Sequence, residues 1–173
     1  MKYKKLICFD FDATLFHTTL PDDGKIVWKE KTGETWPYVG WWSKPETLDL
    51  AIFDTPLNRP VYNEYLKAVS DSENFVILAT GRIERLRPQV EAILNKNNLS
   101  FDGVFLKRGP GDTLYFKTKL FEKFIAELKP EEFIIYDDRE EHLVEFKEWA
   151  KTMPCDVTII DVVSMTTTKI KNK

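Results

Sequence analysis

Cysteine is scarce in this sequence, and its placement excludes two kinds of site. The two cysteines among the 173 residues, Cys8 and Cys155, have neither the spacing of metal ligands nor the number needed for a disulfide framework. Cys8 lies inside an apolar run, so we expect it to be a small core residue, which suits the reducing cytoplasm.

Long apolar segments and an excess of positive charge are also missing. No segment approaches the length that spans a membrane, and the apolar run after the basic start is interrupted by Asp10, unlike that of a signal peptide. The 25 basic and 28 acidic residues give a net charge of −3, so any attraction for phosphate groups must be local. We therefore expect one soluble, cytoplasmic domain over residues 1–173, long enough to bury a good core.

Short apolar runs alternate with helical patterns along most of the chain. Strands are expected at 6–9, 75–79, 104–106, 133–136 and 157–160. Helices are expected from about 60, 88, 112 and 140. Nearly continuous apolar strands joined by helices predict an α/β, Rossmann-like parallel sheet sandwiched by helices. The polar tail over 165–173 is expected to be flexible.

Residues 17–73, between the first two strands, have a different character and predict a flap or cap insertion. The segments 25–30 and 34–36 flank Gly33, which predicts a β-hairpin with a glycine turn. Four of the five tryptophans lie in this insertion. Its aromatic residues either pack against the main domain or, with Trp41 and Trp42 among them, form a stacking surface for bases.

Carboxylates follow two of the expected strands. Asp10 and Asp12 end the first apolar run, and side chains two positions apart on an extended chain point to the same side. Asp137 and Asp138 end the run at 133–136, and ligands of such sheets bind beyond the carboxyl ends of the strands. An Asp-x-Asp pair alone is common in acidic loops. Carboxylates at two strand ends, however, can share a hard cation such as Mg²⁺, which we expect here.

A hydroxyl and two basic groups occur where they can reach the same edge. Thr80 and Arg82 follow the run at 75–79. Lys117 shares a helical stripe with Phe121, so its base faces the core, whereas Lys119 lies about 200° further round the helix among charged residues. Lys117 is therefore the better candidate for the site, although an inward lysine can also extend past a helix start to solvent. These groups suit phosphoryl transfer to a carboxylate, with a second carboxylate moving the proton.

Four segments together resemble the motifs of haloacid dehalogenase (HAD) superfamily phosphatases, in the same order and over most of the chain. They are Asp10-Phe11-Asp12-Ala13-Thr14, Thr80-Gly81-Arg82, Lys117 and Asp137-Asp138. The resemblance implies that Asp10 is the nucleophile and passes through an aspartyl-phosphate. It implies that Asp12 is the general acid/base and binds Mg²⁺ through its backbone carbonyl. A carboxylate at this second position is typical of a phosphatase.

The same resemblance assigns the remaining groups. Thr80 and Lys117 would contact the phosphate, and Asp137 and Asp138 would hold Mg²⁺, Asp138 directly. Ala13 stands where a glycine is frequent in the first motif, and we expect little consequence. We expect His17 and His142 to have ordinary surface or packing roles.

A narrower resemblance concerns the substrate. The segments at Arg82, Lys107-Arg108 and Asp137-Asp138-Arg139 resemble the phosphatase half of phage-type polynucleotide kinase-phosphatases. The segments Gly40-Trp41-Trp42 and Leu106-Lys107 resemble the phosphatase module of Swiss Army Knife RNA repair proteins. Both imply removal of a terminal phosphate, expected to be a 3′-phosphate, from nucleic acid.

In that interpretation Arg82, Arg108, Trp41 and Trp42 contact the substrate. From Arg82 to Arg108 the chain has six basic residues against three acidic ones, so this edge is expected to be locally positive. No Gly-x4-Gly-Lys-Ser/Thr loop is present, so a kinase or ligase partner would be another chain. Two alternatives stay open: a phosphatase of small molecules or nucleotides, and a catalytically silent nucleic-acid-binding module. The presence of both Asp10 and Asp12 argues against the silent module.

Overall fold

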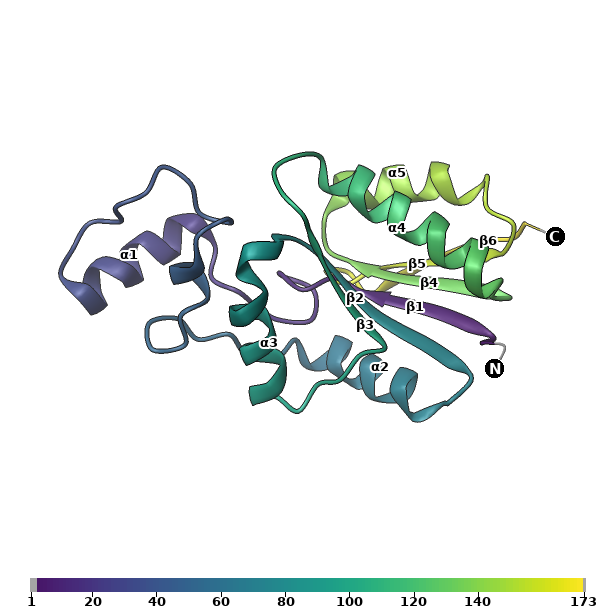
Figure 1. Ribbon diagram of the computed structural model, residues 1–173, viewed down its shortest axis with the longest axis horizontal. Coiled ribbons are helices and arrows are strands. Elements are labelled where there is room, and N and C mark those ends of the chain that lie inside the picture. Colours follow the sequence, from purple (N-terminus) through teal and green to yellow (C-terminus); the bar gives the residue numbers. More distant parts are fainter. Residues whose placement is uncertain (1–2, 173) are drawn as a thin grey trace.

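The computed structural model describes residues 3–172, which fold around one six-stranded sheet with the strand order β3-β2-β1-β4-β5-β6. All neighbouring strands are parallel except β5 and β6, which are antiparallel. The strands are β1 (Lys5–Phe9), β2 (Asn74–Ile83), β3 (Gly103–Lys107), β4 (Glu132–Asp137), β5 (Asp156–Asp161) and β6 (Thr166–Ile170). The expected α/β sheet is confirmed, with every expected strand present (Figure 1).

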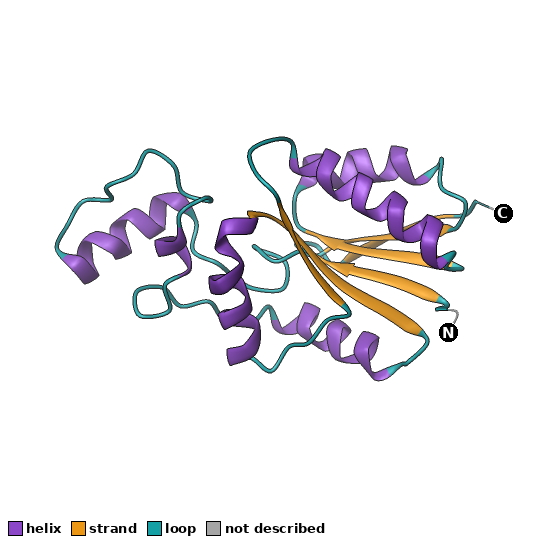
Figure 2. Cartoon of the chain, viewed as in Figure 1, coloured by secondary structure: helices purple, strands orange, loops and turns teal. Residues whose placement is uncertain are grey.

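Two helices pack on each face of the sheet, because alternate residues of the central strands point to opposite sides. The helices are α1 (Pro21–Thr32), α2 (Arg59–Ser70), α3 (Arg87–Lys96), α4 (Thr113–Leu128) and α5 (Glu140–Ala150), with short 3₁₀ turns at Pro45–Leu48 and Glu84–Leu86. Ile7 and Phe9 of β1 pack with α2 and α3, and Leu6 and Cys8 pack with α4 and α5. Figure 2 shows the resulting layers, with the sheet between the two pairs of helices. Cys8 is a buried core residue, as expected.

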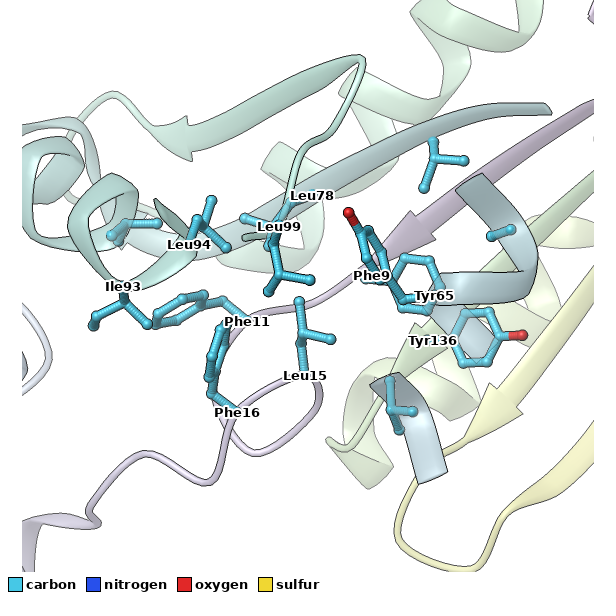
Figure 3. Packing of buried hydrophobic residues seen from close by; sticks show 14 of the residues in the cluster. Phe9, Phe11, Leu15, Phe16, Tyr65, Leu78, Ile93, Leu94, Leu99 and Tyr136 are labelled. Carbon is cyan, nitrogen blue, oxygen red and sulfur yellow. The ribbon is translucent and has the colours of Figure 1, made fainter. Parts of the chain in front are cut away.

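Packed aromatic rings hold the loop that follows β1. Phe9 stacks on Tyr136 of β4, with the ring centroids 4.5 Å apart. Beyond the strand, Phe11, Leu15 and Phe16 are fully buried in the same core (Figure 3). The loop that carries Asp12 and Thr14 is therefore fixed by buried apolar side chains on either side of them.

The expected hairpin in the insertion is wrong, because residues 21–32 form helix α1. Pro21 occupies the first turn, where its missing N–H costs nothing, and Asp22 and Asp23 complement the helix dipole there. Gly33 has φ +77° and donates its N–H to the carbonyl of Lys29. It is therefore a helix-ending glycine rather than a hairpin turn.

The insertion has a small core of its own around Trp36, Trp41 and Phe53. Trp41 is 5% exposed and lies against α1 at Gly24, where an added Cβ would be 2.0 Å from the indole ring. Only glycine allows the helix and the indole to approach this closely. Trp41 therefore packs within the insertion rather than against the main domain, and its buried ring offers no exposed face for a base.

The C-terminal segment is ordered as an edge strand. Residues 166–170 form β6, antiparallel to β5, so the expectation of a flexible tail is wrong for them; Lys173 lies outside the described residues. Threonine and isoleucine are β-branched and favour strands despite the polar composition. Among the helices of residues 3–172, none combines the length and apolar character that crossing a membrane requires.

Candidate active site

A cavity of about 480 Å³ opens beyond the carboxyl ends of β1, β2 and β4. It collects residues from the loop after β1, the insertion, the end of β2 and the starts of α4 and α5. The site residues expected from the sequence that line it are Asp10, Asp12, Trp42, Arg82, Lys117 and Asp138. The polar residues that follow separate strands in the sequence therefore meet around one cavity.

Lys117 joins the two strands that carry the carboxylates. Its ammonium nitrogen lies 2.9 Å from Asp10 Oδ1 and 2.7 Å from Asp137 Oδ2, and the lysine is 2% exposed. The helix α4 that carries it is capped by the carboxylate of Asp112, which accepts a hydrogen bond from the Tyr115 N–H. Lys119, by contrast, is exposed and pairs with Glu122. Lys117 thus faces the carboxylates and Lys119 faces solvent, as the helix geometry predicts, and the role of Lys117 stays a prediction.

The charges around Lys117 are unbalanced toward the negative. Burial raises the pKa of Asp10 to about 8, although the Lys117 ammonium opposes the rise. Burial also opposes ionisation of Asp137, but Lys117 and His142 outweigh it and hold the pKa of Asp137 well below its usual range. The pKa of Lys117 is raised by the two carboxylates in spite of its burial, so the lysine stays charged. One ammonium neutralises Asp137, and Asp10 is left without a full counter-charge.

The carboxylates of Asp10, Asp137 and Asp138 fit a divalent cation. Each offers one oxygen, and these oxygens lie within 4.8 Å of one another. Burial and the neighbouring Asp137 raise the pKa of Asp138. Once all three carboxylates are ionised, the single charge of Lys117 leaves two negative charges, which Mg²⁺ with its hard oxygen ligands would balance. The donor set therefore fits the expected ion, with Asp12 contributing no side-chain oxygen to it.

Asp12 is instead held by a buried arginine. The Arg82 side chain is 1% exposed, and its Nε and Nη2 donate to both carboxylate oxygens of Asp12 at 2.9 Å and 2.8 Å. This two-pronged contact fixes the plane of the carboxylate as well as its position. The Thr18 hydroxyl adds a 2.8 Å hydrogen bond to Oδ1. The buried guanidinium is thus committed to Asp12, which the sequence did not indicate, and the expected contact of Arg82 with substrate stays a prediction.

The backbone is strained directly after Asp12, at Ala13. Ala13 has φ +53°, a left-handed conformation that costs a residue with a Cβ about 1–2 kcal/mol. The glycine frequent at this position would avoid that cost. Alanine at position 13 therefore strains the backbone, where little consequence was expected. Thr14 follows, fully buried, and donates to Asp138 Oδ1 at 3.2 Å. It ties the loop after β1 to the end of β4.

His142 was expected to have an ordinary role, but the structure places it in the site. It lies on α5, is 5% exposed, lines the cavity, and its Nδ1 is 3.6 Å from Asp137 Oδ1. No residue pattern in the sequence distinguishes it from a core histidine. Its position follows from α5 starting directly after β4. His17 is exposed, as expected.

Thr80 and Arg108, also expected from the sequence as site residues, lie outside the cavity lining. Thr80 is fully buried, and its hydroxyl accepts from the Arg82 N–H, so its contact with phosphate stays a prediction. Arg108 is exposed on the loop after β3, outside the cavity lining, which Lys107 reaches instead. Trp42, unlike Trp41, is 43% exposed and lines the cavity. Its ring covers the Arg82 guanidinium at 4.9 Å.

Residues 26–172 match the family model described as HAD domain family 1 in Swiss Army Knife RNA repair proteins. The chain belongs to this HAD family. The matched segment begins after the first strand, so the assignment of Asp10 and Asp12 rests on their positions in this structure rather than on the match.

Two solved structures share the fold of this HAD domain. One, of the Pnkp1/Rnl/Hen1 RNA repair complex, has a TM-score of 0.57 and 23% identity over 89% of this chain and 42% of the matched chain. Another structure of the Pnkp1/Rnl/Hen1 complex has a TM-score of 0.55 and 23% identity, covering 88% of this chain and 45% of the matched chain. This chain therefore corresponds to less than half of each matched chain. No curated protein sequence matches it.

Proposed function

We propose that this HAD domain is an Mg²⁺-dependent phosphatase that removes a terminal 3′-phosphate from nucleic acid through an aspartyl-phosphate on Asp10. The observation that carries the proposal is that Asp10 and Asp12 line the same cavity but have different partners. Asp10 faces Lys117 and the cation site, whereas Asp12 is turned away toward Arg82. The first arrangement suits a nucleophile, and the second suits a group that moves a proton.

The reaction would proceed in two displacements. In the first, an oxygen of Asp10 attacks phosphorus, the bond from phosphorus to the leaving oxygen breaks, and Asp12 donates a proton to that oxygen. In the second, Asp12 takes a proton from water, the water oxygen attacks phosphorus, and the acyl-phosphate bond breaks to release inorganic phosphate and Asp10. Lys117 would stabilise the negative charge of the transferring group. Bound Mg²⁺ would supply the further positive charge that lets a carboxylate approach a phosphate.

Nucleic acid is supported as the substrate class by the family and by the rim of the cavity. The family is named for RNA repair proteins, and one of the two solved structures is described as an RNA repair complex. Lys107 and Arg139 provide positive charge beside the cavity, and Trp42 presents an exposed ring. We propose that a kinase or ligase activity that prepares or joins the ends belongs to another polypeptide segment or chain.

Phosphate release from a panel of substrates tests this function. We expect a 3′-phosphorylated oligonucleotide to exceed a 3′-mononucleotide about tenfold to a hundredfold in kcat/KM, with RNA at least as good as DNA. Salt should reduce the advantage of the oligomer, because phosphate contacts release counterions. Activity should require Mg²⁺. A preference for 5′-phosphate, or equal efficiency on the mononucleotide at low salt, would favour the nucleotide phosphatase instead.

Trp42 is expected to recognise the terminal base. One face of its ring lies on Arg82 and the ring is partly exposed, so a base can stack on it, an interaction worth about 1–3 kcal/mol. Trp42→Ala should lower kcat/KM about tenfold or more for a 3′-phosphorylated oligonucleotide. It should leave an oligomer with an abasic terminal nucleotide almost unaffected.

Tyr38→Ala is a matched control for this test. Tyr38 is an exposed aromatic residue of the same insertion, but it lies outside the cavity lining and packs on Trp36. This variant should discriminate between the two oligomers as the wild type does. Equal losses on the normal and abasic oligomers in Trp42→Ala would contradict a stacking role.

A further inference from the structure

Arg82 connects the acid/base carboxylate to the insertion. Its Nε and Nη2 bind Asp12, while its Nη1 donates to the Trp42 carbonyl at 2.9 Å and to the Thr47 hydroxyl at 2.8 Å. The guanidinium is planar and rigid, so groups bound to its two ends are held in a fixed relation. The position of Asp12 is therefore linked to that of the segment 42–47.

Thr47 uses its hydroxyl in both directions. The hydroxyl oxygen accepts from Arg82, the hydroxyl O–H donates to the Lys44 carbonyl at 2.7 Å, and Thr47 is 2% exposed. A second arginine supports the same segment, because Arg85 Nη2 donates to the Ser43 carbonyl at 3.0 Å. The segment 42–47 is thus held on the end of β2 by two arginines. Thr47 is its one side chain that hydrogen-bonds to Arg82.

The burial of Arg82 makes these contacts consequential. A guanidinium that is 1% exposed cannot replace a lost protein acceptor with bulk water without moving. If Nη1 loses an acceptor, the arginine gains by rotating toward solvent or toward the cavity, and Asp12 loses the geometry of its two-pronged contact. Damage to the segment 42–47 should therefore be transmitted to Asp12.

We propose that Thr47 is a positioning residue for catalysis, which acts through Arg82 to orient the Asp12 carboxylate for proton transfer to the leaving oxygen. The insertion thereby takes part in the chemical step as well as forming one wall of the cavity. This inference rests on the proposed phosphatase function, and it is independent of whether the physiological substrate is nucleic acid.

The dependence of the rate on the leaving group tests the proposal. The oxygen of an alkyl phosphate, such as a 3′-phosphorylated oligonucleotide, needs a proton as it leaves. The oxygen of 4-nitrophenyl phosphate leaves as a stable phenolate and does not. The value of kcat/KM includes only the steps up to departure of this group. Thr47→Val, which keeps the shape and removes the hydroxyl, should lower kcat/KM about tenfold for the oligonucleotide and less than about twofold for the aryl phosphate.

Two further variants separate positioning from general damage. Thr47→Ser retains the hydroxyl and should restore activity on the oligonucleotide. Thr158→Val removes another buried hydroxyl, far from the cavity. Thr158 lies on β5 and donates to Glu132 of β4 at the opposite end of the sheet, so this variant should hydrolyse both substrates as the wild type does. Inhibition by inorganic phosphate should be unchanged in Thr47→Val, because the phosphate site itself is not altered.

The outcomes distinguish this inference from the proposed function. If wild-type protein hydrolyses neither substrate, the phosphatase function is wrong and the inference fails with it. If the wild type is active and Thr47→Val loses activity equally on both substrates, or on neither, only the positioning role is wrong. A selective loss on the alkyl phosphate, rescued by serine, supports it.

Discussion

Asp10→Asn is expected to lower the rate of phosphate release from every substrate by a factor of roughly 10⁴ or more, because it removes the attacking oxygen rather than weakening binding. Asparagine has nearly the same shape and can still accept a hydrogen bond from Lys117. The fold should therefore be retained. Release of phosphate from 4-nitrophenyl phosphate, which is independent of the nucleic-acid contacts, gives the most direct measurement.

The same variant should become more stable than the wild type when Mg²⁺ is absent and the pH is high. Burial raises the pKa of Asp10 to about 8, against an ordinary value near 4. Between these values the metal-free folded state holds a proton that the unfolded chain has lost, so the free energy of unfolding falls as pH rises from about 4 to about 8. Asp10→Asn removes this contribution, and thermal melts with chelator at pH 5 and pH 8.5 should show it.

Mg²⁺ should reverse the loss of stability in the wild type. Added Mg²⁺ is expected to raise the melting temperature of wild-type protein most at high pH, where Asp10 is ionised, and to raise that of Asp10→Asn less. Asp54→Asn, an exposed substitution of the same kind, is the control and should behave as the wild type does. Normal turnover by Asp10→Asn, or full wild-type activity in excess chelator, would contradict Asp10 as the nucleophile of a metal-dependent reaction.

The sheet and the cluster of carboxylates could be predicted because their signals are local. Each buried strand is an apolar run followed at once by a polar residue, and parallel strands bring these ends together. The phase of a helix is equally local, so Phe121 sufficed to turn Lys117 inward and Lys119 outward. Residues close in sequence were enough for each of these predictions.

The insertion could not be predicted in the same way, because its structure depends on contacts between distant residues. Residues 25–36 predicted a hairpin around Gly33, whereas Pro21 and Gly33 are the first residue and the C-terminal cap of helix α1. Nothing in the sequence indicates that the acceptors of Arg82 are the carbonyl of Trp42 and the hydroxyl of Thr47, 40 and 35 residues away. The separation of Trp41, which is buried, from Trp42, which is exposed, likewise depends on how α1 packs.

Lys117→Ala is expected to lower kcat by about 10²–10³, because the charge aimed at the transferring group is lost. Lys117 is the one cation that contacts both Asp10 and Asp137 among the ion pairs of the described residues. Its pKa is raised, so it stays charged across the pH range of an assay and adds no limb to the pH–rate profile. The measurement is kcat on 4-nitrophenyl phosphate at saturating Mg²⁺.

Loss of stability must be separated from loss of chemistry in this variant. Removing one partner of a buried ion pair typically costs about 3–5 kcal/mol, since the remaining carboxylates lose their counter-charge. Lys117→Met keeps the volume of the stem and lacks only the charge, so it should be better folded and equally slow. Rates normalised to the folded fraction, measured by circular dichroism, then report the role of the ammonium group itself.

Lys119→Ala provides the comparison on the same helix. Lys119 is exposed, pairs with Glu122 across one turn of α4 and lies over the Tyr115 ring. Exposed pairs of this kind contribute little to stability, and this one lies outside the cavity lining. We therefore expect Lys119→Ala to retain turnover within about twofold of the wild type. The two lysines lie on different faces of α4. A large loss of turnover in Lys119→Ala together with normal turnover in Lys117→Met would therefore overturn the assignment of Lys117.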